Sequence, residues 1–238
     1  GGDHWRIEDC AFIWGDMAGL NVKGRYHLIR QSTFSHNGEL GIAYNGSDAA
    51  HDWHWYYDCP PHKTVFENLD VTHNNYRSFQ PNWAAGGMKL ITSIRDVTVR
   101  RCYVAHNRGH GIWFDSSLGN NIVEDNLVVG HSHSGIHYEI SVPGSGDEFG
   151  CVIRNNRVIE GETHAIYVSA AQHAIVENNT CFRNRFGIVV HGMPRDFKSY
   201  AERFGQPLTL SHNRVRKNVM YGLHCDLVVY DGEHASDN

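Results

Sequence analysis

Several features are missing from the 238-residue sequence, and each absence argues against a class of protein. No apolar run approaches the ~20 residues that a membrane helix needs, so we expect no membrane partner. The six cysteines form no Cys-x-x-Cys pair, which argues against a zinc ribbon or a redox motif. The net charge is −5 with histidine neutral, which argues against nucleic acid as a partner.

The two ends of the sequence carry no start methionine and no recognisable secretion signal. The chain opens at Gly1-Gly2 and closes in a polar stretch, residues 231–238. We therefore expect residues 1–238 to form one domain, which could be the trimmed part of a longer protein. The 18 histidines are scattered along the chain rather than grouped at metal-ligand spacing, so we predict no metal site and no cofactor from them.

What the sequence does contain is an internal repeat of roughly 22 to 30 residues. Each repeat has an inward Asn, Cys or Ser, a turn residue five positions later, and then a glycine that opens a strand. The inward column runs Cys10, Ser32, Leu69, Cys102, Asn126, Asn156, Asn179 and Asn213. The turn column runs Gly15, Asn37, Asn74, Asn107, His131, Gly161, Asn184 and Asn218. The glycine column runs Gly19, Gly41, Gly87, Gly111, Gly135, Gly187 and Gly222, with Ala165 as the exception.

These columns predict an all-β fold, a right-handed parallel β-helix of about eight coils in which each coil buries its apolar residues against its neighbours. Asn tolerates left-handed backbone at the turns, and Gly supplies positive φ at the corners. Cys10 and Cys102 lie in the inward column, so we expect both to be buried. The alternative fold is an antiparallel sandwich, which would not produce columns in register.

Four insertions interrupt the repeat, at residues 45–63, 76–85, 142–150 and 192–207, and we expect them to border a binding surface. The only short helix that we predict lies at residues 196–204. The first insertion is rich in aromatic residues and includes Trp53 and Trp55. It predicts a platform on which sugar rings stack, although a loop packed against the coil would fit the same composition.

The strand after each glycine predicts where chemistry could occur. Its second and fourth residues point outward on one face, because side chains alternate along a strand. Column four contains Asp115 and Glu139 on consecutive coils, with His191 two coils further. Since stacked strands lie about 4.8 Å apart, the two carboxyls should lie near ~5 Å from each other and face solvent. Like charges placed opposite each other are destabilising, so a purely structural sequence would avoid this pair.

The neighbours of the two acids suit a sugar site. Column two contains Lys89, Trp113 and His137, and it also passes through Tyr167 and His224; column four ends at Asp226. We expect Trp113 to offer a stacking face, and Lys89 and His137 to bind hydroxyls. Retaining glycosidases hold a nucleophile and an acid/base about 5–5.5 Å apart, which matches the predicted spacing. The competing interpretation is a pair of surface carboxylates neutralised by Lys89 and nearby histidines.

Three segments carry a resemblance to known proteins: residues 82–89, which include Trp83; residues 106–115; and residues 135–141. They resemble bacterial right-handed β-helix carbohydrate-active proteins, in particular β-helical glycoside hydrolases of the family 120 and family 141 kind. The resemblance implies Asp115 as nucleophile and Glu139 as acid/base. It also implies a polysaccharide or oligosaccharide substrate bound by Lys89, Trp113, His137, His191, Trp53, Trp55 and Trp83, and an extracellular or periplasmic location. The β-sandwich module of the family 120 kind is absent from this sequence.

The leading hypothesis is therefore a retaining glycoside hydrolase. A polysaccharide lyase or uronate epimerase is the second hypothesis, with Lys89, or His137 together with Tyr138, as the base and with Ca²⁺ as a cofactor in the lyase case. A non-catalytic glycan-binding β-helix, such as a spike protein, is the third. The sequence leaves the sugar, its linkage and the oligomeric state open.

Overall fold

The computed structural model describes residues 2–46, 59–192, 202 and 204–230, and the strand pairs in this part of the chain are parallel. Every coil contributes a strand to one eight-stranded sheet, here called the first sheet. Its strands are β1 (Arg6–Glu8), β4 (Leu28–Arg30), β7 (Val65–Glu67), β10 (Thr98–Arg100), β13 (Asn121–Glu124), β16 (Cys151–Arg154), β19 (Ile175–Glu177) and β21 (Arg214–Arg216).

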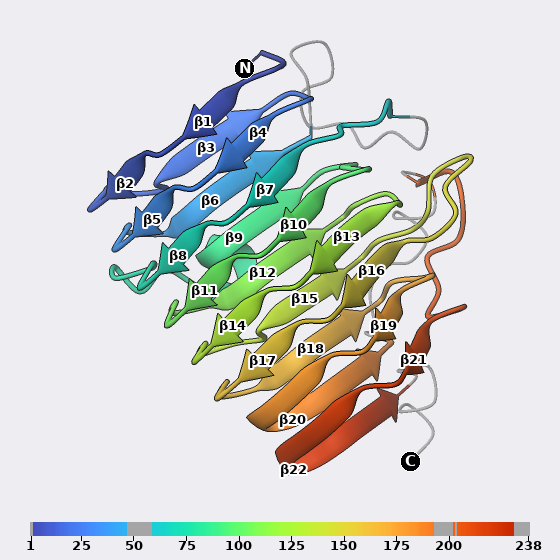
Figure 1. Cartoon of the computed structure of the whole chain (residues 1–238). Helices are drawn as coiled ribbons and strands as arrows, with labels where there is room; N and C mark the ends of the chain where they lie inside the picture. The colour runs from blue at the N-terminus through green and yellow to red at the C-terminus, as the bar shows by residue number, and fades with distance from the viewer. Residues whose placement is uncertain (1, 47–58, 193–201, 203, 231–238) are drawn as a thin grey trace.

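The remaining strands form two further parallel stacks. The middle stack contains β2 (Ala11–Ile13), β5 (Thr33–Ser35), β8 (Asp70–Thr72), β11 (Tyr103–Ala105), β14 (Leu127–Val129) and β17 (Arg157–Ile159). The second stack contains β3 (Leu20–Lys23), β6 (Leu40–Asn45), β9 (Gly86–Ile91), β12 (His110–Asp115), β15 (Ile136–Glu139) and β18 (His164–Ser169). The long strands β20 (Thr180–His191) and β22 (Val219–Tyr230) run through both stacks, which therefore join at this end (Figure 1).

The core fills the interior of the coils. Inward residues of neighbouring strands lie in register and are fully buried, for example Met88, Ile112 and Ile136 in the second stack. This arrangement confirms the predicted parallel β-helix and excludes the antiparallel sandwich. Cys102 is buried as predicted, but Cys10 is exposed, because its coil has a neighbour on only one side.

Asparagine side chains form ladders between coils. In the inward column, the Asn126 backbone N–H and Nδ2 both donate to Asn156 Oδ1, and Asn156 makes the same pair of bonds to Asn179. The ladder ends at Asn218, which accepts from Asn179. The prediction of Asn213 for this position was wrong by five residues, because two asparagines at that spacing fit the repeat equally well. Asn213 instead accepts from the Ala174 backbone N–H.

The same slip affects the last strand. Gly187 lies opposite Asp226, and Val189 pairs with Val228, so Gly222, His224 and Asp226 do not occupy the predicted columns. Gly222 pairs with Asn184 and lies at the turn instead. A register shift between Phe182 and Phe186 in the pairing of β20 with β22 accounts for the difference.

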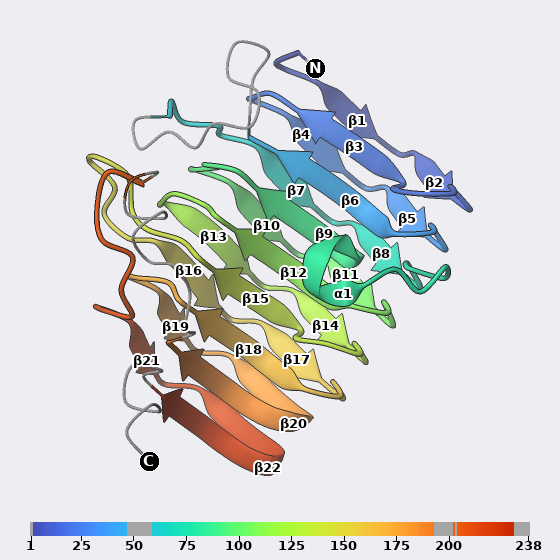
Figure 2. The same cartoon turned by 180° about the vertical axis from the view of Figure 1, so that it is seen from behind.

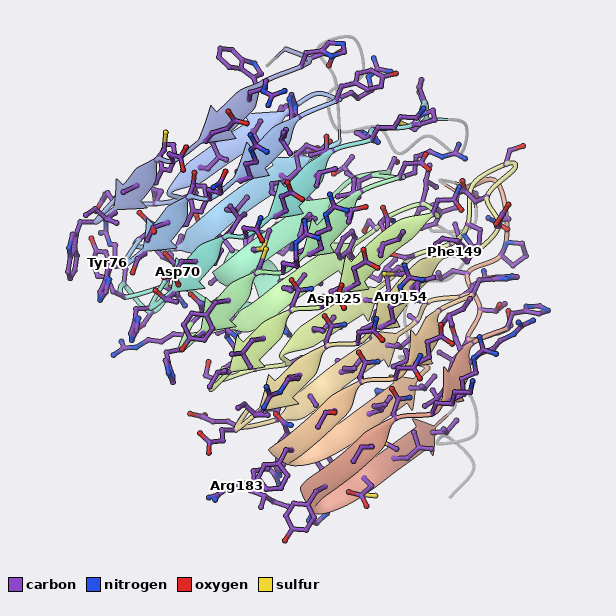
Figure 3. The ribbon with its side chains drawn as sticks, viewed as in Figure 1. Asp70, Tyr76, Asp125, Phe149, Arg154 and Arg183 are labelled. Atoms are coloured by element: carbon purple, nitrogen blue, oxygen red, sulfur yellow. The ribbon has the colours of Figure 1, made fainter. Side chains whose placement is uncertain are left out.

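The corners of the coils use left-handed backbone, but not at the predicted residues. The left-handed residue directly precedes the ladder residue, as at Asp125 before Asn126 (φ 57°) and Arg183 before Asn184 (φ 58°). The Arg183 side chain stands away from the coil in Figure 3. Of the glycine column, none is left-handed. These glycines provide space: a Cβ on Gly111 would lie 2.4 Å from the Gly135 carbonyl oxygen of the next coil.

All four predicted insertions border the second stack, three after β6, β15 and β20 and one before β9. The described helix, α1 (Pro81–Ala84), lies in the second insertion and over the outer face of this stack (Figure 2). Most of the predicted helix at 196–204 lies outside the described residues. A small apolar cluster, here called the corner cluster, joins the strand ends to the last insertion: Leu118, Ile140, Val142, Ala170, Phe204 and Leu208. In the described part of the chain no helix is long and apolar enough to cross a membrane.

Candidate functional site

Asp115 and Glu139 pair directly across β12 and β15, as the repeat predicted. The residues directly before them, Phe114 and Tyr138, are buried in the apolar core, so the alternation along each strand places both carboxylate side chains on the outer side of the coil. They do not face open solvent, however, because Asp115 is 8% and Glu139 5% exposed. Long side chains from neighbouring coils stand on the same face and cover them. The site is therefore a buried polar cluster rather than an open surface.

Asp115 has two polar partners. Lys89 Nζ on β9 lies 3.0 Å from Asp115 Oδ2, and Ser116 Oγ donates to Oδ1 at 2.8 Å. Lys89 is itself buried, and its Nζ also donates to the backbone carbonyl of Trp83 on α1. This hydrogen bond connects the second insertion, which contains α1, to Lys89 on β9. This ion pair is shielded from water, so its two charges interact more strongly than a surface pair would.

Trp113 does not provide the stacking face that we predicted. Lys89 Nζ lies 3.7 Å from the centroid of its ring, and His137 from the next coil stacks on it at 5.5 Å and 14°. β9 and β15 flank β12 on opposite sides, so both faces of the indole are occupied. Its Nε1–H donates to Glu139 Oε2 at 3.2 Å.

The rings of column two continue into a stack. His137 packs on Tyr167 at 4.7 Å, and the Tyr167 hydroxyl hydrogen-bonds His191 Nδ1 at 2.9 Å. His137 Nε2 hydrogen-bonds Ser169 Oγ at 2.9 Å and lies 4.0 Å from Glu139 Oε2. Lysine, indole, imidazole and phenol thus follow one another on successive coils, and His191 adds a second imidazole.

Two histidines of the site were missed by the sequence reasoning. The His110 ring lies 4.6 Å from both Trp113 and His137, and the His164 ring lies 4.4 Å from Tyr167. Burial lowers the pKa of His110 well below its ordinary value and that of His164 to about 4, so both are neutral at neutral pH. Each is the first residue of its strand and directly precedes the glycine column, or Ala165 in its place. This position lies outside columns two and four.

The remaining predicted residues divide into two groups. Trp83 is 78% exposed on α1, with Lys89 Nζ 5.8 Å from the centroid of its ring, so it is open to a ligand at the edge of the site. Trp53 and Trp55 lie outside the described residues. The predicted partners Lys89, Trp113, His137 and His191 are gathered on one face, as their columns required.

The backbone turns directly after the carboxylates. Ser116, Ile140 and Ala170, which follow Asp115, Glu139 and Ser169, are all left-handed. Ile140 (φ 45°) is unusual, because a β-branched residue rarely adopts this conformation and does so at a cost. Its side chain is held in the corner cluster, so packing there maintains the turn that ends the strand at Glu139.

The described residues do not fit a metal ion. Within them, no group of three or more His, Cys, Asp or Glu side chains is placed to hold one, although histidines are frequent on this face. Several of these histidines pack against neighbouring rings instead, as His137 does on Tyr167.

Comparison with solved structures shows the fold. The periplasmic alginate epimerase AlgG superposes with a TM-score of 0.66 at 18% identity over 95% of this chain and 50% of its own. The A-module of the Azotobacter vinelandii mannuronan C-5 epimerase AlgE4 gives a TM-score of 0.57 at 11% identity over 94% of this chain and 58% of its own. This chain thus spans about half the length of AlgG and somewhat more than half that of the AlgE4 A-module.

No match was found among curated proteins. The sequence does match the family described as the right handed beta helix region, over residues 1–143 and 147–227. The match covers most of the chain and agrees with the parallel coils described above. The chain therefore belongs to the right-handed β-helix family.

Proposed function

We propose that this protein modifies a uronate-containing polysaccharide by removing the proton at C5, next to the sugar carboxylate, as an epimerase or a lyase. The observation that carries the proposal is the ordered row Lys89, Trp113, His137 and Tyr167, with Tyr167 hydrogen-bonded to His191. The row places a cation, a ring nitrogen base and a phenolic proton donor on one outer face. AlgG is an alginate epimerase and AlgE4 a mannuronan C-5 epimerase, which supports this substrate class.

The chemistry assigns a role to each group. A base removes the C5 proton, and the electron pair spreads into the neighbouring carboxylate, where a nearby cation stabilises the added charge. We assign the base to His137 and the cation to Lys89. Because His137 and Tyr167 stack on each other, both lie on one side of a bound sugar, and a proton returned by solvent to the opposite face would invert C5. Loss of the O4-linked sugar from the same intermediate, with Tyr167 donating a proton to the leaving oxygen and His191 restoring it, would instead cleave the chain and leave a double bond.

The environment suits proton transfer at neutral pH. An imidazole can accept a proton only in its neutral form, and the neutral state of His110 and His164 adds no competing positive charge around His137. Since AlgG is a periplasmic protein, we also propose a periplasmic or extracellular location.

The test is solvent exchange at C5. Polymannuronate and polyguluronate are incubated with the protein in deuterated water, and incorporation of deuterium at C5 and the ultraviolet absorbance of an unsaturated product are followed. We expect incorporation, with a loss of about 100-fold or more in His137→Gln, and a loss of any unsaturated product of the same order in Tyr167→Phe, in line with the contribution of a general base or acid. Absence of both exchange and new absorbance on a panel of uronate polymers would overturn the proposal.

A glycoside hydrolase remains the second candidate, because Asp115 and Glu139 lie opposite each other on adjacent strands. It predicts new reducing ends without a double bond, lost in Asp115→Asn and in Glu139→Gln. The same polymer panel, extended to neutral glycans, separates hydrolysis from elimination. Tight glycan binding with no product of either kind would instead select the non-catalytic binding protein.

A further inference from the structure

Trp113 occupies the centre of the candidate site, where it contacts Lys89, His137 and Glu139. β12 lies between β9 and β15, so the indole stands between Lys89 on one side and His137 on the other. The ring is only 2% exposed. A residue in this position cannot offer a face to a sugar.

Each part of the indole has its own partner. One face holds the Lys89 ammonium, with Nζ 3.7 Å from the ring centroid, which is the geometry of a strong cation–π contact. The other face carries the His137 ring, nearly parallel to it. The Nε1–H donates to Glu139 Oε2, which orients that carboxylate. The His110 ring also packs against the indole, at 4.6 Å between ring centroids.

The arrangement also gives the two carboxylates different partners. Lys89 pairs with Asp115, whereas Glu139, one coil further, takes its hydrogen bond from the neutral indole. A smaller side chain at position 113 would leave a gap between the ammonium and the imidazole, and it would leave the Glu139 oxygen without this donor. Both changes would move groups that need fixed positions for proton transfer.

We propose that Trp113 is a positioning residue: its two faces and its N–H hold Lys89, His137 and Glu139 in place, and it does not contact substrate. The kinetic part of this inference rests on the proposed uronate activity, whereas the geometric part does not. The two are tested separately.

The geometric test uses the folded protein without substrate. The indole N–H resonance of Trp113 is assigned by its absence from the spectrum of Trp113→Phe. We expect that resonance to shift upfield in Glu139→Gln, because a neutral acceptor replaces a carboxylate, and to stay in place in Asp115→Asn. An unchanged resonance in Glu139→Gln overturns the inference, whatever the protein does to polysaccharides.

The kinetic test compares Trp113→Phe, which keeps the ring faces and removes the N–H, with Trp113→Leu, which removes both. Loss of a hydrogen bond to a charged group predicts a fall in kcat of about ten-fold or more in Trp113→Phe. Loss of the cation–π contact predicts a further fall of about two-fold or more in Trp113→Leu. KM should remain near the wild-type value in both variants.

A matched control is Trp14→Phe, because Trp14 is 64% exposed at another corner of the coil. It should leave both constants unchanged. A rise in KM with unchanged kcat in Trp113→Phe would assign the indole to substrate binding and overturn the positioning role. If none of the variants or the wild type turns over any uronate polymer, the proposed function fails, while the resonance test still decides the role of Trp113.

Discussion

At the scale of single residues, glycine in this chain provides space between coils. Gly87 and Gly111 both lack room for a side chain: a Cβ at either position would come within 2.4 Å of a carbonyl oxygen on the next coil. Neither has a positive φ. The requirement for glycine comes from the close approach of parallel backbones at the start of the second-stack strands. Ala165 is the exception to it among the predicted positions.

We therefore expect Gly111→Ala to destabilise the protein by about 1–3 kcal/mol, the usual cost of forcing extra volume into a packed region. The urea midpoint of unfolding measures it. Gly2→Ala is the control, because a Cβ there would meet only Trp5, at an ordinary contact distance of 3.4 Å. Equal midpoints for the two variants would show that the coils can separate freely at Gly111.

At the scale of elements, the asparagine ladder connects strands that are far apart in the sequence. Asn156 accepts from both Asn126 nitrogens and donates to the Val123 carbonyl, so one side chain satisfies buried groups on two coils. Such groups would otherwise be buried without partners, which is costly. The ladder therefore favours one pairing register over its neighbours.

Asn156→Ala should cost about 2 kcal/mol or more, because the Asn126 N–H and the Val123 carbonyl both lose their partner in a buried site. Asn218→Ala removes the same set of bonds at the last coil, where the site is only half-buried and water can replace them. We expect a clearly smaller loss there. Unfolding midpoints of the two variants make the comparison, and an equal loss would contradict the burial argument.

The outer face of the first sheet carries a second ladder, made of alternating charges. Reading from coil to coil, one column contains Glu8, Arg30, Glu67, Arg100, Glu124, Arg154, Glu177 and Arg216. Arg154 donates to Glu124 at 2.6 and 2.9 Å, and its side chain stands on this face in Figure 3. Each charge between the two ends of this column therefore has opposite charges on both neighbouring coils.

Exchanging the two charges tests whether alternation matters beyond the single pair. Glu124→Arg combined with Arg154→Glu keeps that pair but places arginine beside Arg100 and glutamate beside Glu177. We expect the double variant to be less stable than wild type, by about 0.5–1 kcal/mol, since like charges on adjacent strands repel. The difference in melting temperature should shrink at 1 M salt. Wild-type stability at low salt would show that only the local pair counts.

At the scale of the whole molecule, buried histidines link stability to pH. Burial lowers the pKa of His62, His131 and His164 to about 4 in the folded chain, against an ordinary value of 6.5. Between these values the unfolded chain binds more protons than the folded one, so stability rises with pH. The resulting loss of folding stability is absent above about pH 6.5 and grows as the pH falls toward 4.

His131 offers a clean test, because it occupies a ladder position held by Asn107 on the coil before. His131 Nε2 bonds the Val104 carbonyl as Asn107 Nδ2 bonds that of Val71. We expect the unfolding free energy of His131→Asn to rise less steeply than that of the wild type between pH 4.5 and 7. The difference in slope should be at most that of one bound proton. His212→Asn, an exposed control, should leave the slope unchanged. An unaltered slope in His131→Asn would mean that other histidines account for the pH dependence.

Much of the fold could be predicted from the repeat, since identical chemistry at each coil fixes which residues face inward and which lie opposite one another. The pairing of Asp115 with Glu139, and of Lys89 with Trp113, followed directly. The last coil was displaced because its asparagines at 213 and 218 fit the pattern in two ways. His110 was not predicted because it lies outside columns two and four, although its ring packs against that of His137.

The amino-acid sequence by itself determined the coil architecture and the alignment of the candidate residues, because a ladder residue that occurs once per coil fixes the register, as it does on the coils that carry Lys89, Asp115 and Glu139. Only the tertiary structure decided what surrounds them: that the two carboxylates are covered, that Trp113 is enclosed by Lys89 and His137, and that α1 reaches Lys89. Column positions place side chains on a face, whereas the direction and contacts of each side chain depend on the neighbours that share the space.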